Sequence, residues 1–190
     1  MRPDFLKRVW DIHSRYERLA MYAYRYDEVE QGALGSLDFS ELDAKCVLRN
    51  PENYGGCLTV RKKWLMEING YEQHPLFGSG NHANGRDIYT RLKILGLAIQ
   101  WEPSLELYHP WHPFTLESTS EHACQHKVIA WRRRNMHAQA FQGIDPSRDC
   151  TPASAQKVVD RQTRKLAREA RWLKLRSTLR RSIGRGDVGA

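Results

Sequence analysis

Apolar residues recur along most of the chain at intervals that distinguish helices from strands. Residues 2–19 place an apolar side chain at every third or fourth position, which predicts an amphipathic helix. Residues 20–27 alternate tyrosines with other side chains, the pattern of a strand. Residues 62–70 have the pattern of a short helix, and their closing pair Asn69-Gly70 is a helix-stop signal.

The rest of the chain continues this alternation of helical and extended patterns. The further predicted elements are a long surface loop with short elements at 27–53, a strand at 54–62, a turn leading into a helix at 78–96, strands at 97–103 and 105–110 that each end near a proline, and helices at 116–141 and 155–183. Alternating helices and strands predict an α/β body. This body is expected over residues 1–143, followed by a linker at 144–154 and a basic amphipathic helical tail at 155–190.

The net charge of +8 is concentrated in the tail. Residues 1–150 contain 19 Lys and Arg against 19 Asp and Glu, whereas residues 151–190 contain 11 against 3. The neutral body gives no electrostatic support for nucleic-acid binding. No apolar run reaches the roughly 20 residues of a membrane span, and the N-terminus lacks the apolar core of a signal peptide. The expected location is cytoplasmic, with peripheral attachment at the inner face of the membrane as an option that the tail raises.

Several short motifs follow one another in a fixed order. They are paired glycines before a strand, a basic residue opening a short helix, an Asn-Gly-Tyr-Glu turn, a glycine-rich loop leading into a helix, and a histidine after an apolar run. In order and spacing they resemble the C-terminal half of a family 2 glycosyltransferase of the GT-A fold, the part described as a galactosyltransferase C-terminal domain. The resemblance covers about residues 1–115, and the matching residues are Gly55, Gly56, Arg61, Asn69, Gly70, Tyr71, Glu72, Gly78, Gly80, Asp87, Ile88, Arg91, Leu92, Gly96 and His109.

The resemblance implies the C-terminal part of an α/β GT-A fold, the fold of nucleotide-diphospho-sugar transferases. In that family a donor-binding half precedes this region and carries an Asp-x-Asp motif, which holds Mn²⁺ or Mg²⁺ against the diphosphate. No Asp-x-Asp occurs in the 190 residues. The donor half is therefore expected on a separate chain or in a longer reading frame, and the divalent metal is expected only where that half is present.

The loop that leads into the helix after residue 82 is the candidate catalytic region. In the family an acidic pair stands three and two residues before the position of Asp87, and one of these acids deprotonates the acceptor hydroxyl. Here the two positions are Asn84 and Gly85, neither of which takes up a proton usefully. The remaining catalytic candidates are Asp87 and His82, an imidazole that titrates near neutrality. The alternative is that His82 is a polar loop residue and that Asp87 caps its helix or pairs with Arg91.

The segment His-Pro-Trp-His-Pro is the candidate metal-binding region. In related enzymes a histidine after this strand completes the metal shell, which implies His109 as the first candidate ligand and His112 as the second. The alternative is that both histidines cap the end of a strand. Trp111 and Trp101 are candidates for lining an acceptor groove, because sugar rings stack on aromatic faces, or equally for core packing.

Three small residues complete the candidate substrate-binding set. Gly55 and Gly56 are expected beside the donor sugar, where the missing side chain allows close backbone approach, or else in an ordinary bulge. Asn84 joins this set through its place in the loop.

The tail carries apolar residues among many Lys and Arg. Seven-residue spacing relates Val159, Leu166 and Leu173, and a stripe is extended by Trp172, Leu175 and Leu179. Three interpretations stay open: a helix on an anionic membrane surface, a helix that pairs with a partner chain, and a solvated, partly disordered end.

Together these implications predict a partial glycosyltransferase chain. The reaction would transfer a hexose-type sugar from a nucleotide-sugar to the hydroxyl of a glycan or lipid-linked acceptor, in the synthesis of cell-envelope polysaccharide or a glycoconjugate. The rival prediction is a non-catalytic binding or scaffold module that has lost the donor half and the acid pair. Asn84 and Gly85 favour the rival, whereas the His-Pro-Trp-His-Pro and Gly-Gly segments favour the enzyme.

Overall fold

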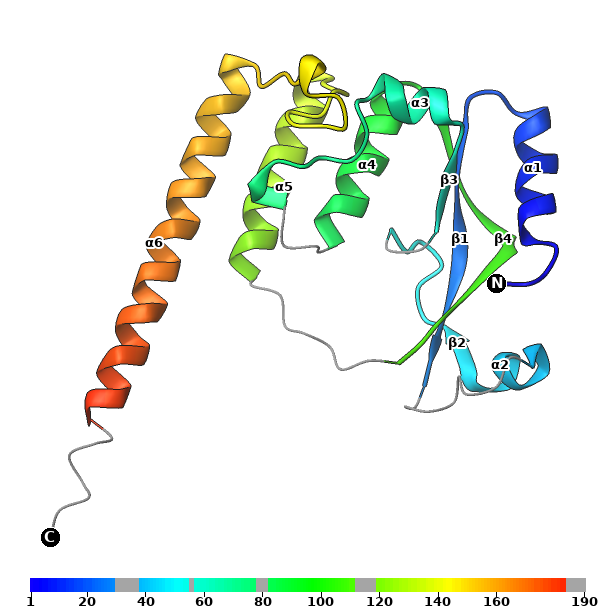
Figure 1. The fold of residues 1–190 in the computed structure, drawn as a ribbon, viewed down its shortest axis with the longest axis horizontal. Coiled ribbons are helices and arrows are strands. Elements are labelled where there is room, and N and C mark those ends of the chain that lie inside the picture. The colour runs from blue at the N-terminus through cyan, green and yellow to red at the C-terminus, as the bar shows by residue number, and fades with distance from the viewer. Residues whose placement is uncertain (30–37, 55–56, 78–81, 112–118, 184–190) are drawn as a thin grey trace, which may run out of the picture.

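The protein has a mixed α/β fold, seen in a computed structural model that describes residues 1–29, 38–54, 57–77, 82–111 and 119–183, without the side chains of 82, 119–120 and 177–183. The elements are α1 (Phe5–Arg15), β1 (Leu19–Glu28), α2 (Phe39–Lys45), β2 (Cys46–Leu48), β3 (Leu58–Val60), α3 (Lys62–Glu67), the 3₁₀ helix η2 (Pro75–Phe77), α4 (His82–Ile94), β4 (Ala98–His109), α5 (Thr119–Asn135), the 3₁₀ helix η3 (Pro146–Arg148) and α6 (Ala153–Ile183). Figure 1 shows α1 on one side of the sheet, α4 and α5 on the other, and α6 beyond α5. The α/β class expected from the alternating pattern is confirmed.

β1 is the central strand of the four-stranded sheet. It pairs antiparallel with β2 through residues 26–28 and with β3 through residues 20–22, and it pairs parallel with β4 from residue 19 to residue 27. β4 runs beside nearly the whole length of β1. The opposite edge of β1 is therefore shared by β2 and β3. No strand within the described residues pairs with the outer edge of β4.

The two strands expected at 97–103 and 105–110 are a single strand, so that prediction was wrong. Pro103 lies inside β4, where the pairing with β1 is irregular. Ala23 of β1 pairs with Glu102, and the next residue of β1, Tyr24, pairs with Glu106. The intervening residues bulge out of the ladder. A bulge on a strand at the edge of the sheet accepts a proline, because no N–H is needed there.

The loop with short elements expected at 27–53 contains the short α2 and β2, as predicted, although its first two residues belong to the end of β1. One further expectation was wrong in extent. The helix expected at 116–141 ends at Asn135, because Met136 takes a left-handed backbone conformation with a φ of 50°. After this residue the chain turns back toward α3, so residues 137–143 pack on the body instead of continuing a helix.

Three apolar clusters hold the layers together. One lies between α1 and the sheet and contains Phe5, Leu19, Met21, Ala23 and Leu105. A second lies between the sheet and α4 and contains Ala20, Ile68, Ile88, Leu92 and Leu97. The third includes Val128 and Ile129 of α5 together with Ala155 and Val159 of α6. The first turns of α6 therefore belong to the core, although the sequence suggested that the tail begins at residue 155.

Asn69 connects residues 144–154 to the body. The Asn-Gly helix stop is confirmed, since Asn69 has a φ of 59° and Gly70 a φ of 73°. The fully buried Asn69 side chain accepts a hydrogen bond from the Asp145 N–H at 2.9 Å and donates one to the Asp145 carbonyl at 3.1 Å. Arg148 donates to two carbonyls at the end of α3, at 2.6 and 3.0 Å. The segment expected as a linker is thus a turn packed on α3.

This packing predicts resistance to trypsin at Arg148. We expect Asn69→Gly, which keeps the positive φ but removes the side-chain hydrogen bonds, to speed cleavage after Arg148 by about tenfold, because the bonds that close the turn are lost. Timed digestion with mass spectrometry of the fragments measures this rate. Asn50→Gly is the matched control, at an exposed turn where the Asn50 side chain accepts a hydrogen bond from the Glu52 N–H. Equal cleavage rates in the parent and Asn69→Gly would show that residues 144–154 move freely.

Candidate functional site

Asp87 lies inside the protein, between α4 and α5. Its side chain is 0% exposed. Arg91, one turn later on α4, donates from Nε to Asp87 Oδ2 at 2.7 Å, which is the pairing that the helical spacing suggested. Arg132 of α5 forms an ion pair through Nε with Asp87 Oδ1 at 2.8 Å. With each carboxylate oxygen paired to an arginine, Asp87 is not placed to take a proton from an acceptor hydroxyl.

Glu72 extends this pairing into a buried ion network of four residues: Glu72, Asp87, Arg91 and Arg132. Arg132 contacts Glu72 as well as Asp87, and both side chains of this second pair are fully buried. Two positive and two negative charges make the network neutral, the condition under which buried charges are tolerated. Burial lowers the pKa of Arg132 by penalising its charged form, and the Asp87 carboxylate opposes this shift.

The network also satisfies backbone groups of the turns around it. Arg91 donates to the Ile68 and Gly70 carbonyls at 3.0 and 2.7 Å, at the end of α3. Glu72 accepts hydrogen bonds from the N–H groups of Phe141 at 2.8 Å and Gln142 at 3.0 Å. One cluster therefore holds α3, α4, α5 and the returning segment after α5 in place.

Gly85 faces a close backbone approach at the start of α4. A Cβ atom at Gly85 would lie 2.4 Å from the Tyr54 carbonyl oxygen, so this position excludes any side chain. Asn84 donates from its side-chain amide to the Phe77 carbonyl at 2.8 Å. His82 is the first residue of α4, and its side chain lies outside the described part of the structure. Asn84 thus ties down the preceding turn, and Gly85 makes room for the backbone of Tyr54.

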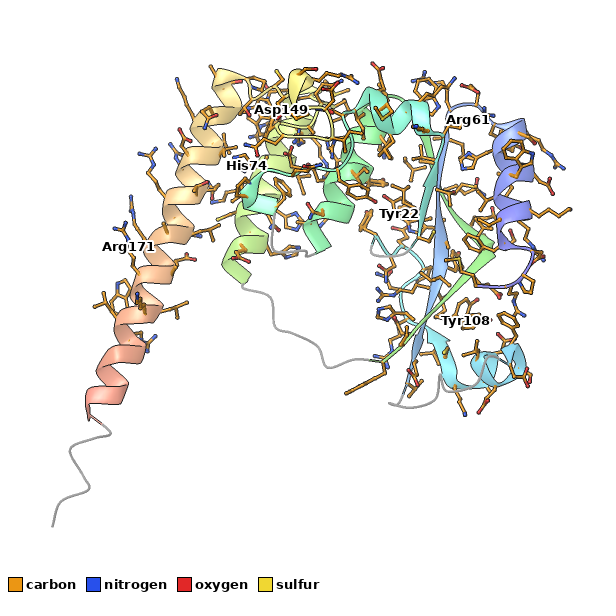
Figure 2. All side chains as sticks on the ribbon, viewed as in Figure 1. Tyr22, Arg61, His74, Tyr108, Asp149 and Arg171 are labelled. Carbon is orange, nitrogen blue, oxygen red and sulfur yellow. The ribbon has the colours of Figure 1, made fainter. Side chains whose placement is uncertain are left out.

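Four aromatic side chains form a cluster between the sheet and α4, beside Gly85: Tyr22, Tyr54, Tyr89 and Trp101. Tyr22 stacks on Trp101 with ring centroids 5.5 Å apart. Tyr54 meets Tyr89 edge to face at 5.0 Å and Trp101 at 5.7 Å. Figure 2 shows Tyr22 on β1, in the space between that strand and α4. We call these four residues the aromatic cluster.

The aromatic cluster contains polar atoms that the fold leaves without partners. Tyr22 Oη and Trp101 Nε1 are buried and have no hydrogen-bond partner among the described residues. Burial raises the pKa of Tyr22, and the neighbouring tyrosines, Tyr71 first, raise it further. Arg86 lies over the Tyr54 ring, with its guanidinium carbon 5.9 Å from the centroid. Tyr54, Tyr89 and Trp101 are partly exposed, so the aromatic cluster presents ring surface at which a ligand with an apolar face can pack.

A second group of candidate side chains lies where β1 and β4 end. His109 Nδ1 is 3.1 Å from Asp27 Oδ1, and Arg25 Nε is 2.8 Å from the same oxygen. The Trp111 N–H donates to the buried Glu28 carboxylate at 2.6 Å, and the Trp111 ring is 39% exposed. A carboxylate on Nδ1 orients an imidazole, as it does behind many metal-binding histidines.

The structure keeps these two groups apart. Tyr22 and Asp27 are five residues apart on β1, which corresponds to about 17 Å along a strand. Trp101 therefore belongs to the aromatic cluster and Trp111 to the strand end, so the two do not line one small pocket. Gly55, Gly56 and His112 lie outside the described residues. Among the side chains described, no group of three or more His, Cys, Asp or Glu residues is placed to hold a metal ion.

Sequence reasoning identified Trp101 but missed its partners. Tyr22 was expected only as part of the strand of alternating tyrosines. Tyr54 was expected at the start of a strand over 54–62, whereas it lies in the turn before β3. Tyr89 offered one usable signal, because it follows Gly85 by four positions and so lies on the same face of α4.

Comparison with known proteins adds nothing further: no protein-family model, curated protein or solved structure matches this chain.

The buried ion network predicts a large stability difference between two neighbouring arginines of α5. Arg132→Met leaves the buried Glu72 carboxylate without its arginine and Asp87 with Arg91 as its remaining arginine, so the network gains a net negative charge. We therefore expect the free energy of unfolding to fall by about 3–5 kcal/mol. Arg134→Met removes the same charge from an exposed position and is expected to leave stability unchanged within error. Urea unfolding followed by circular dichroism measures both variants. If Arg132→Met and Arg134→Met unfolded with midpoints at a similar urea concentration, the network would not hold α5 to α4.

Proposed function

We propose that this chain is the acceptor-binding part of a glycosyltransferase, and that its own contribution to sugar transfer is to bind and orient a glycan. The observation that carries the proposal is the aromatic cluster at the N-terminal end of α4. In the family that the sequence resembles, the acceptor hydroxyl reaches the reaction centre at this helix end. Positioning of this kind accelerates a transfer because it removes the entropy cost of bringing two substrates together.

The chemistry of the aromatic cluster fits a sugar better than a purely apolar ligand. The C–H face of a pyranose packs on aromatic rings such as Trp101 and Tyr89, while its hydroxyls hydrogen-bond to polar groups at the ring edges. Tyr54, Tyr89 and Trp101 are partly exposed and so present ring surface to such a ligand, whereas Tyr22 is fully buried and stacks on Trp101.

The metal expected for this family fits only in part. His109, oriented by Asp27, suits the role of a single ligand. Among the described residues, no group of three or more His, Cys, Asp or Glu side chains is placed around it to hold a metal ion. A divalent ion, when held by a donor half, would neutralise charge on the leaving diphosphate.

Two surfaces support the idea that a donor half packs against this chain. The outer edge of β4 carries no strand among the described residues. On α1, Leu6 and Trp10 are 77% and 76% exposed and line an apolar groove that continues to Val60 and Arg61. An open strand edge and an exposed apolar groove are both surfaces that soluble proteins usually cover.

The rival function, a non-catalytic glycan-binding module, is favoured by one observation. Gly85 stands at a position of the family's acid pair, and the Tyr54 carbonyl occupies the space that an acidic side chain would need. Asp87, the nearest carboxylate on α4, is engaged in the buried ion network. Both functions share glycan binding and differ in whether sugar is transferred once a donor half is supplied.

Glycan binding is tested by substituting one tryptophan inside β4 and one just beyond its end. We expect Trp101→Leu to weaken binding of neutral oligosaccharides by about tenfold, because a stacking face is lost. Trp111→Leu, two residues beyond the end of the same strand, is the matched control and is expected to bind like the parent. Titration calorimetry against a panel of gluco-, galacto- and manno-oligosaccharides measures the affinities, and near-UV circular dichroism checks that the variants are folded.

Two outcomes would contradict the proposal. If the parent binds no oligosaccharide of the panel, the aromatic cluster is ordinary packing. If Trp111→Leu loses affinity and folded Trp101→Leu does not, the glycan binds at the strand end near His109 instead.

A further inference from the structure

The long helix α6 has two different apolar faces. The first face packs on the body. Its buried residues are Ala155, Val159 and Gln162, and it continues to the half-buried Leu166. These residues follow one another at intervals of four, three and four, which places them on one side of the helix. This face accounts for the apolar residues in the first half of the helix. Figure 1 shows that the second half extends away from the rest of the fold.

The second apolar face points elsewhere. Trp172 and Leu175 are 66% and 61% exposed. At about 100° per residue, they lie about 120° and 180° around the helix axis from Leu166, so they cannot continue the face that packs on the body. In the sequence, Leu179 follows Leu175 by four positions. Packing within the described chain therefore gives no reason for this second apolar face.

Basic residues surround the second face. Arg168 lies between Trp172 and Leu175 around the helix axis, while Arg171 and Arg176 flank the pair within about 40° on either side. All three arginines are exposed, and Figure 2 shows Arg171 on the projecting half of α6. Residues 161–183 contain nine Lys and Arg and one acidic residue, Glu169. The occupant of this face must therefore accept apolar side chains and carry negative charge.

A second copy of the chain meets the first condition but not the second. Pairing two such helices along this face would bring two strongly positive segments together, which costs binding energy. Nucleic acid meets the second condition but offers no apolar layer to Trp172 and Leu175. The surface of an anionic bilayer meets both, since tryptophan favours the membrane–water interface and each basic side chain gains attraction to acidic headgroups. No helix in the described residues is long and apolar enough to cross a bilayer.

We propose that the projecting half of α6 binds the surface of an anionic membrane, with Trp172 and Leu175 inserted at the interface and Arg168, Arg171 and Arg176 against the headgroups. This inference is independent of the glycosyltransferase proposal, because it rests only on α6.

Vesicle co-sedimentation of the full chain tests the proposal. We expect binding to vesicles of phosphatidylcholine with 30% phosphatidylglycerol, falling by about tenfold or more in Trp172→Ala/Leu175→Ala because buried apolar area is lost. Arg168→Gln/Arg171→Gln is expected to lose about fivefold for each charge removed. Vesicles of phosphatidylcholine alone are expected to retain little protein.

The fold offers a matched control for the apolar pair. Leu6→Ala/Trp10→Ala removes the same two residue types from α1, where they are at least as exposed as on α6. This variant is expected to bind anionic vesicles like the parent.

Three results would overturn the proposal. Binding that is equal for the parent and Trp172→Ala/Leu175→Ala would exclude insertion. Tighter binding to a DNA or RNA duplex than to anionic vesicles would make nucleic acid the partner. A parent dimer in sedimentation velocity that Trp172→Ala/Leu175→Ala converts to monomer, without vesicle binding, would make the face a contact between two copies of the chain.

Discussion

Charges buried in a protein interior must be paired, and this constraint organises the half of the molecule that carries the candidate site. Glu72, Asp87, Arg91 and Arg132 come from a turn and two helices, and their charges cancel. Removing one member leaves a charge that the interior cannot solvate. The turn after α3, the helices α4 and α5, and the segment that returns after α5 are therefore held together as a unit rather than by separate contacts.

The network also fixes the rotation of α4 about its axis. Asp87 and Arg91 must face α5, which directs neighbouring positions of the same helix toward the sheet. Tyr89 then lies against Trp101, and Arg86 lies over Tyr54. The aromatic cluster thus depends on ion pairs that touch none of its rings. Asp87, a candidate catalytic acid in the sequence, serves here to orient α4, the helix that carries part of the proposed binding surface.

Local patterns in the sequence identified most of what is local in the structure. The helix before β1, the strand of alternating tyrosines and the Asn-Gly helix stop all follow from spacing or turn chemistry, and so does the pair Asp87–Arg91. Long-range partners left no such signal: Arg132 and Glu72 are 60 residues apart in the chain. The same holds for Tyr54, whose ring partners Tyr22, Tyr89 and Trp101 are all more than 30 residues away in the chain. Pro103 misled the prediction of β4 because a proline ends a strand unless a bulge removes the need for its N–H.

The contact between Gly85 and the Tyr54 carbonyl has a consequence for how this chain could change over evolutionary time. An acidic residue at position 85 is incompatible with the present backbone at Tyr54, since even a Cβ atom would lie 2.4 Å from that oxygen. Moving this backbone would withdraw Tyr54 from the aromatic cluster. The two positions are therefore epistatic. An acidic side chain could be accommodated at position 85 only after substitutions that rebuild the aromatic surface, so a single mutation there cannot add a base to the present site.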